Sequence, residues 1–267
     1  MENLNEIEST LFVPLLGRIF ASENYPNLFE DKKSLSIKDK LPKDLCSNEQ
    51  TEYTLLAGAT RSVNMDRIIR KFIHRHENGV IVNIGCGLDT AFFRNNNCKN
   101  KWYEVDLKEV IEYRNQFFEE TTLDKYIVAD VFDIGWIKKI REENPQSPIL
   151  NVASGFFYFF EYDKVVELFT QLKNYGDIEI VFDTVSKSGS KRMHHYMKKV
   201  GHEKLPTYFY VDDGEKFAES MQMKLLLEEP YYRYIYKNKF KLITKITMNI
   251  SDKFGMVKMI QLKLNYW

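Results

Sequence analysis

The stretch Val80-Ile-Val-Asn-Ile-Gly-Cys-Gly-Leu-Asp89 decides the fold of this chain. It opens as a short apolar run rich in β-branched residues, which is typical of a buried strand. The run ends abruptly at Gly85-Cys86-Gly87. Glycines at the carboxyl end of a strand let the backbone turn sharply and let a ligand approach it closely. Because open α/β sheets bind nucleotide-like ligands at this edge, the stretch predicts a ligand site at residues 85–87.

A carboxylate follows at the spacing that a nucleoside site requires. Asp106 closes the next strand-like run, 101–105, at roughly the 20-residue offset expected of an acid that accepts hydrogen bonds from ribose hydroxyls. Glu104 alternates onto the same strand face and can support Asp106 or be a surface acid. A strand-end aspartate also suits the N-cap of a following helix. With the glycine turn, we favour the ribose role, and the pair predicts an adenosine-containing ligand.

The residues after the glycines select among adenosine cofactors. A dinucleotide fingerprint needs G-x-G-x-x-G, but the third glycine position is Thr90 and Asp89 precedes it. A carboxylate at that turn is expected to repel a pyrophosphate. The sequence has no G-x-x-x-x-G-K-[ST], so a P-loop is excluded. The remaining common candidate is S-adenosylmethionine, which carries a sulfonium and no phosphate, with S-adenosylhomocysteine as its product.

Composition limits the partners and the location. Lysine plus arginine and aspartate plus glutamate number 38 each, and this balance suggests neither a nucleic acid nor a membrane as partner. The three cysteines are odd in number and lack metal-ligand spacing, which indicates no metal site and a reduced cytoplasmic setting. The first residues are acidic rather than basic, unlike a signal peptide. Apolar stretches such as 156–160 are far too short to span a membrane.

Strand and helix patterns alternate along most of the chain, which predicts an α/β fold with a largely parallel sheet covered on both faces. We expect a helical N-terminal cap over 1–60 and the ligand-binding domain over 61–267, as one structural unit. Late runs at 240–250 and 256–265 are expected to pair as an antiparallel hairpin. The other predicted strands are 80–85, 101–106, 126–131, 148–154, 178–184 and 224–229, and the predicted helices are 61–74, 107–119, 136–143 and 162–174.

Several motifs in order resemble the leucine carboxyl methyltransferase family, and most closely its bacterial branch of tetracenomycin-type polyketide O-methyltransferases. The central match runs from Asn83 to Thr90 and continues through 93–94 and 102–107. Upstream, the likeness includes 10–18 and the R-x(4)-D helix start at 61–66. Downstream, it includes 133–136, 153–158, 182–183 and 211–214. The resemblance implies a Rossmann-like class I methyltransferase sheet, mostly parallel with a late antiparallel hairpin.

The same resemblance implies further cofactor-binding residues. Arg61 would pair with the methionine carboxylate of the cofactor, for which the bidentate geometry of arginine is suited. Asp130 would take the exocyclic amine of adenine, and the backbone of Val131 a ring nitrogen. Ser154 stands where many family members carry a glutamate near the cofactor's amino-acid end, so it can hydrogen-bond but supplies no charge. Cys86 lies between the two glycines of the turn.

The predicted function is transfer of a methyl group from S-adenosylmethionine to oxygen, a hydroxyl or a carboxylate, on a small-molecule acceptor. A carboxylate acceptor needs no base, whereas a hydroxyl needs one near neutral pH. Tyr158 and His195 are candidates for the acceptor pocket, and no residue is assigned as a catalytic base. Core packing for Tyr158 and an exposed helix position for His195 are the plainer interpretations. Two alternatives stay open: a nicotinamide-dependent Rossmann oxidoreductase, and a cofactor-binding protein without transfer activity.

Overall fold

The structure is a computed structural model that describes residues 2–42, 50–191 and 208–265. Its strands are β1 (Val80–Ile84), β2 (Trp102–Asp106), β3 (Asp124–Val128), β4 (Ile149–Ala153), β5 (Ile178–Val185), β6 (Lys224–Pro230) and β7 (Val257–Lys263). Its α-helices are α1 (Glu2–Asn24), α2 (Lys32–Ile37), α3 (Glu52–Arg75), α4 (Ala91–Asn95), α5 (Lys108–Arg114), α6 (Gly135–Glu143), α7 (Tyr162–Leu172), α9 (Gly214–Ser220) and α10 (Leu242–Lys253). Short 3₁₀ turns are η1 (Lys38–Lys40), η3 (Phe157–Phe159) and η4 (Lys173–Tyr175).

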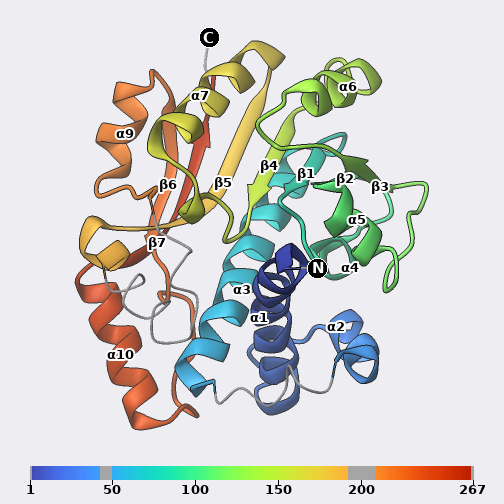
Figure 1. The fold of residues 1–267 in the computed structure, drawn as a ribbon. Helices are drawn as coiled ribbons and strands as arrows, with labels where there is room; N and C mark the ends of the chain where they lie inside the picture. The colour runs from blue at the N-terminus through green and yellow to red at the C-terminus, as the bar shows by residue number, and fades with distance from the viewer. Residues whose placement is uncertain (1, 43–49, 192–207, 266–267) are drawn as a thin grey trace.

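These strands form one sheet in the order β3-β2-β1-β4-β5-β7-β6 (Figure 1). The pairs from β3 to β5 are parallel, whereas β7 is antiparallel to both β5 and β6. Strands β2 and β3 follow β1 on one side, and β4 and β5 lie on its other side, so the order in which the strands are added reverses between β1 and β4. Because these five strands are parallel, their carboxyl ends lie at one edge of the sheet. A mostly parallel sheet with a late antiparallel pair is confirmed. This edge is where the predicted site residues lie.

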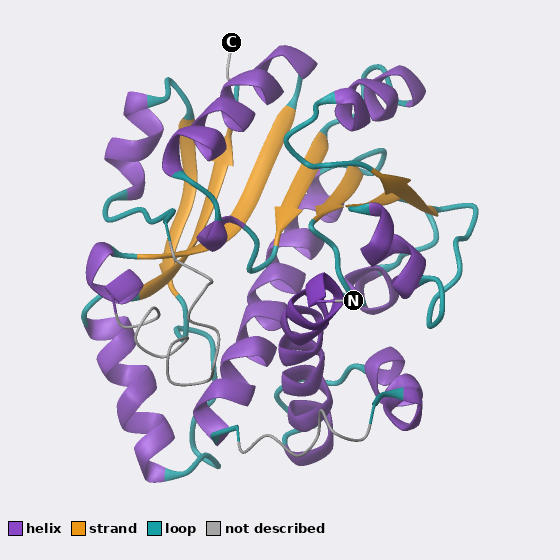
Figure 2. Ribbon diagram, viewed as in Figure 1, coloured by secondary structure: helices purple, strands orange, loops and turns teal. Residues whose placement is uncertain are grey.

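Helices cover both faces of the sheet, as Figure 2 shows. One buried cluster packs α6, α7 and α9 against the sheet, with Trp136, Phe169 and Phe217 among its members. The second cluster lies on the opposite face and contains residues of α3 and α10, such as Ile69 and Met248. Because apolar residues on both sides are buried, β1 and β4 contain only buried residues.

The N-terminal helices pack beside the carboxyl edge of the sheet. Helix α3 starts at Glu52, where the Thr51 side chain accepts a hydrogen bond from the Thr54 N–H at 3.2 Å. It is therefore longer than the predicted helix, and the boundary that we placed after residue 60 falls inside it. Helices α1 and α3 pack so closely that a Cβ at Gly17 would lie 2.6 Å from the Leu55 carbonyl oxygen. Residues on both sides of the predicted boundary thus belong to one helix.

The strand predicted over 240–250 is wrong, because this segment forms α10. Thr244, Met248 and Ser251 are its buried residues, and their spacing of three to four is helical. The run is rich in isoleucine and threonine, which mimic a strand in composition. In place of this segment, β6, at the strand predicted over 224–229, pairs antiparallel with β7.

Smaller differences concern the ends of elements. The third strand spans Asp124–Val128 rather than 126–131, so Asp130 and Val131 lie in the loop after it. Helix α5 ends at Arg114, five residues before the predicted end at 119. Among the described residues, no helix combines the length and apolar character needed to cross a membrane.

Candidate active site

The glycine turn follows β1 directly and has the backbone conformation that glycine favours. Gly85 and Gly87 have φ angles of +63° and +49°, in the left-handed region. The N–H of Gly85 donates to the Val105 carbonyl at 2.9 Å, which fastens the turn to β2. A Cβ at Gly85 would lie 2.1 Å from the Phe156 ring, so no larger residue fits. Cys86 between them is buried, and burial raises the pKa of its thiol well above the ordinary value.

Asp106 lies beside this turn at the end of β2. One carboxylate oxygen accepts the Gly87 N–H at 2.9 Å and the other accepts the Leu107 N–H at 2.8 Å. Burial raises the pKa of Asp106 above its ordinary value, although the two backbone hydrogen bonds lower it. Each carboxylate oxygen has two lone pairs, so the group can still accept from both hydroxyls of a ribose. The structure thus brings the two halves of the predicted nucleoside site together.

Arg61 lies across the sheet edge, near the ends of β4 and β5. Its Nε donates to Asp183 Oδ2 at 2.7 Å. The same carboxylate accepts the Tyr158 hydroxyl at 2.7 Å and the Gly155 N–H at 2.7 Å. Burial alone would lower the pKa of Arg61, but Asp183 raises it well above the ordinary value. Since a guanidinium has five N–H donors, Arg61 can bind a ligand carboxylate while it stays paired.

Asp183 is the residue at this edge that sequence reasoning did not assign to the site. Its side chain is completely buried and holds Arg61, Tyr158 and the Gly155 backbone at once. The position at the end of β5 was a signal, because acids at the carboxyl ends of parallel strands face the ligand edge. Spacing alone could not show that Asp183 pairs with Arg61, because the two residues are 122 positions apart in the sequence.

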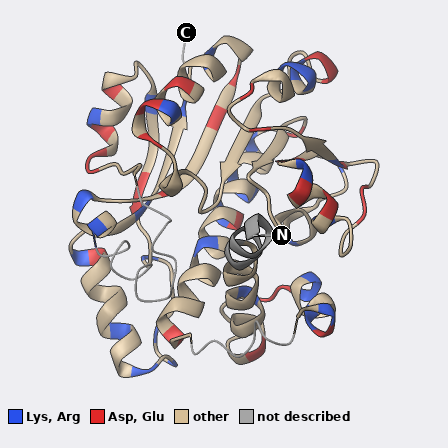
Figure 3. Cartoon of the chain, in the orientation of Figure 1, with Lys and Arg blue, Asp and Glu red and all other residues tan. Residues whose placement is uncertain are grey.

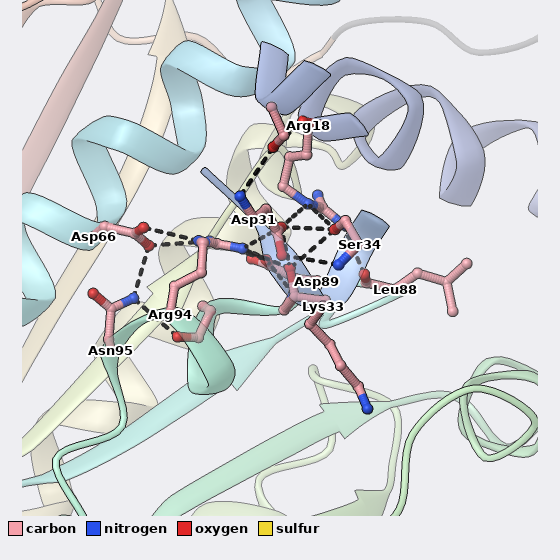
Figure 4. A network of polar contacts seen from close by, with 12 residues as sticks. Arg18, Asp31, Lys33, Ser34, Asp66, Leu88, Asp89, Arg94 and Asn95 are labelled. Atoms are coloured by element: carbon pink, nitrogen blue, oxygen red, sulfur yellow. Dashed lines mark hydrogen bonds and ion pairs between the residues drawn. The ribbon is translucent and has the colours of Figure 1, made fainter. Parts of the chain in front are cut away.

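A second polar network joins the N-terminal helices to the glycine turn (Figure 4). Arg94 contacts the carboxylates of Asp66 at 2.8 Å, Asp31 at 3.0 Å and Asp89 at 3.3 Å. Arg18 adds a contact to Asp31 at 3.2 Å and donates to the Leu88 carbonyl at 2.7 Å. Burial would raise the pKa of Asp31 and of Asp89, but Arg94 and Arg18 lower both below the ordinary value. Asp31 and Asp89 are therefore held in the ionised form.

This arrangement changes one sequence argument. Asp89 was expected to repel a pyrophosphate, but its side chain pairs with Arg94 and accepts the Thr90 N–H at 2.6 Å. Its charge is thereby balanced within the protein. The choice against a dinucleotide therefore does not rest on Asp89.

The predicted adenine residues lie after β3. The Asp130 side chain is exposed and accepts the Phe132 N–H at 3.0 Å. Val131 is buried, and its carbonyl accepts the Trp136 indole N–H at 2.9 Å. Both residues lie at the same carboxyl edge as Asp106, one strand farther out.

The remaining predicted residues are Ser154, Tyr158 and His195. Ser154 lies between β4 and Gly155, half-buried at the sheet edge. Tyr158 is 2% exposed, with its hydroxyl bound to Asp183, so it contributes to holding Arg61. His195 lies outside the described residues. Within the described parts of the chain, no group of three or more histidine, cysteine or acidic residues could hold a metal ion.

Comparison with known protein families shows which family the chain belongs to. The model of the leucine carboxyl methyltransferase family matches residues 5–173, which is more than half of the chain. The chain belongs to the leucine carboxyl methyltransferase family. It is an S-adenosylmethionine-dependent methyltransferase, as the sequence predicts, and the nicotinamide alternative is excluded.

One curated relative and two solved structures are similar to this chain. The chain is 23% identical over 184 residues to the tetracenomycin polyketide synthesis O-methyltransferase TcmP of Streptomyces glaucescens, covering 68% of this chain and 67% of TcmP. The fold is similar to a protein assigned to the methyltransferases from Thermobifida fusca, with a TM-score of 0.61 and 10% identity over 96% of this chain and 93% of that one. It is also similar to a DUF574 family protein from Streptomyces avermitilis, with a TM-score of 0.60, 11% identity and coverage of 92% and 96%.

The residues present fit S-adenosylmethionine. Asp106 and the glycine turn offer acceptors and a close backbone approach for a nucleoside, and Arg61 offers a cation for an amino-acid carboxylate. These groups lie along one edge, in the order of β2, β1, β4 and β5. A ligand with a nucleoside at one end and an amino acid at the other matches this order.

Proposed function

We propose that this protein transfers the methyl group of S-adenosylmethionine to an oxygen atom, hydroxyl or carboxylate, of a small molecule. The observation that carries the proposal is the Asp106 carboxylate held against the glycine turn, with the Arg61 guanidinium at the far end of the same edge. The likeness to TcmP supports oxygen of a small molecule as the acceptor. Free thiols at Cys86 and Cys98 support a cytoplasmic location.

In this proposal each residue has a defined task. Asp106 accepts hydrogen bonds from the ribose, Arg61 binds the methionine carboxylate, and Gly85, Cys86 and Gly87 let the backbone lie against the ligand. Asp130 and the backbone of Val131 receive the adenine. Ser154 contributes a hydrogen bond near the amino-acid end. Tyr158 acts through Asp183 to position Arg61. His195, which lies outside the described residues, stays a candidate for the acceptor pocket from the sequence alone.

The cofactor, when bound, supplies an electrophilic methyl group on a sulfonium. The protein then has to align the acceptor oxygen in line with that methyl group and keep water out. Charge is neutralised as the reaction proceeds, so positioning and exclusion of water supply much of the acceleration. A carboxylate acceptor reacts without a base, whereas a hydroxyl acceptor needs one near neutral pH.

The test is calorimetry with S-adenosylhomocysteine on the wild type and on Asp106→Asn. We expect micromolar binding by the wild type and at least about tenfold weaker binding by the variant, because a charge-assisted contact is lost. Glu112→Gln is the matched control, since it removes a carboxylate that is 64% exposed on α5. Equal affinity of Asp106→Asn and the wild type would contradict the site.

Transfer itself is tested with radiolabelled S-adenosylmethionine and a panel of small phenols, alcohols and carboxylic acids. Labelled product that is cleaved by base indicates an ester, and product that resists base indicates an ether. Binding of S-adenosylhomocysteine with no transfer to any acceptor of the panel would favour a cofactor-binding protein without transfer activity.

A further inference from the structure

The solvent-facing side of α10 is unusually apolar. Among the described residues, 13 large hydrophobic side chains are exposed, and seven of them fall between Tyr234 and Phe254. Isolated exposed apolar side chains are ordinary, but a contiguous group marks an interaction surface. The exposed members in this segment are Tyr234, Tyr236, Leu242, Ile243, Ile246, Ile250 and Phe254.

The apolar side chains of α10 form a stripe on the face opposite the core. At about 100° per residue, Leu242, Ile246 and Ile250 fall within one narrow sector. Leu242 is 72% exposed, Ile246 45% and Ile250 39%. The buried residues of the helix, such as Met248, point to the other side. The helix therefore presents an apolar face to solvent, opposite the face that packs against α3 and β7.

Basic residues surround this stripe, although the whole chain is neutral. The segment 233–253 contains six lysines and arginines and one acid, Asp252, which gives a formal charge of +5 from six minus one. Two of these cations have partners within the segment: Lys237 lies 3.5 Å from Asp252, and Lys245 donates to the Asn238 carbonyl. The exposed ones are Arg233, Lys239, Lys241 and Lys253. Figure 3 shows basic positions along α10, at the edge of the molecule.

We infer that the face formed by 234–254 binds the surface of an anionic lipid bilayer, with α10 lying in the interface. An amphipathic helix of this kind buries leucine, isoleucine and phenylalanine among the acyl chains while lysines reach the anionic headgroups. Tyr236 and Phe254, at 71% and 63% exposure, flank the stripe as aromatic residues do at membrane interfaces. Because the whole chain is neutral, its net charge does not reveal this local excess of positive charge.

Charge also argues against a second copy of the chain as the occupant. Two copies that met through this face would bring one group of lysines against another, which disfavours association. An anionic surface instead complements these cations. The face lies beyond residue 173, where the family match ends, so the inference is independent of the methyltransferase assignment.

The test is flotation of the full chain with vesicles of phosphatidylcholine alone and with vesicles that also contain phosphatidylglycerol. We expect binding to the anionic vesicles only, and weaker binding as salt rises. Lys239→Gln/Lys253→Gln should bind roughly 25-fold more weakly, from about a fivefold contribution per lysine. Lys138→Gln/Lys139→Gln, which removes two exposed lysines from α6, should bind like the wild type.

The apolar stripe is tested with Ile246→Ser/Ile250→Ser. Val128→Ser is the control, because Val128 is an exposed apolar residue of β3, 55% exposed, that lies outside the stripe. We expect the stripe variant to lose vesicle binding while its affinity for S-adenosylhomocysteine is unchanged. Binding by no vesicle, equal binding to both vesicle types, or full binding by the stripe variant would overturn the inference. Self-association in sedimentation velocity that Ile246→Ser/Ile250→Ser abolishes would overturn it in favour of a dimer.

Discussion

Replacement of Arg94 is the sharpest test of the network that joins the N-terminal helices to the glycine turn. The guanidinium is 5% exposed and contacts the carboxylates of Asp31, Asp66 and Asp89 within 3.3 Å. Arg94→Met would leave these buried charges with only part of their countercharge. Breaking a buried ion pair by removing one partner costs about 3–5 kcal/mol, and we expect a loss of unfolding free energy in that range. Arg94→Lys, which keeps the charge without the planar fork, should lose less.

The stability of the Arg94→Met variant should depend on pH between neutral and mildly acidic conditions, where the contribution of Asp31 and Asp89 to the wild type is constant. Because the pKa values of Asp31 and Asp89 are lowered in the fold, their contribution is present above the unfolded pKa of about 4 and is lost only as the pH falls below it. Without Arg94, burial raises these pKa values, so the variant becomes more stable as the pH falls from neutral. Urea unfolding followed by circular dichroism at roughly pH 7.5 and roughly pH 5.5 measures the free energy of unfolding of both proteins and its change with pH.

Arg70→Met is the matched control, because Arg70 also pairs with Asp66, at 3.8 Å, but is 62% exposed. We expect it to cost less than about 1 kcal/mol, as surface ion pairs do. An Arg94→Met protein within about 1 kcal/mol of the wild type at both pH values would refute the reasoning.

Three further predictions concern single residues. Gly85→Ala should destabilise the protein by about 2–4 kcal/mol in urea unfolding, because Gly85 has a left-handed conformation and the added Cβ would meet the Phe156 ring. Gly255→Ala is the control: its φ is +54° and the space around it is open, so it should cost about 1 kcal/mol. Equal losses for the two variants would contradict the clash. Asp183→Asn should cost about 3 kcal/mol in the same assay, since it removes the countercharge of the half-buried Arg61 and breaks an ion pair whose carboxylate is completely buried. A change below about 1 kcal/mol would show that the pair contributes little. Iodoacetamide at mildly alkaline pH, followed by peptide mass mapping, should label the exposed Cys98 well before Cys86, whose pKa is raised by burial, and the reverse order would be inconsistent with the fold.

The sequence predicted the parts of the site that are local in the chain. The glycine turn and Asp106 belong to one strand–turn–helix–strand unit with a characteristic spacing, so they could be found from residue types alone. The resemblance to a family added Arg61, which composition would have left as a solvated helix residue. The family assignment is confirmed.

The parts that the sequence could not supply depend on segments that meet only in the fold. Asp31, Asp66 and Asp89 come from three segments and share one arginine, and nothing in their spacing indicates a common partner. The segment 242–253 was misassigned because isoleucine and threonine favour strands in composition, while its burial follows a helical period. Tertiary packing decided that choice.

The position of β7 has a consequence for how the protein is made. This strand is the last of the described chain, yet it lies between β5 and β6 rather than at the rim. During synthesis, β5 and β6 therefore emerge with unpaired backbone edges and must wait for residues 257–263. A nascent chain that is truncated before these residues exposes two strand edges at once. Residues 257–263 have to be made before the sheet can close, and a stop before them should yield an aggregating product rather than a smaller enzyme.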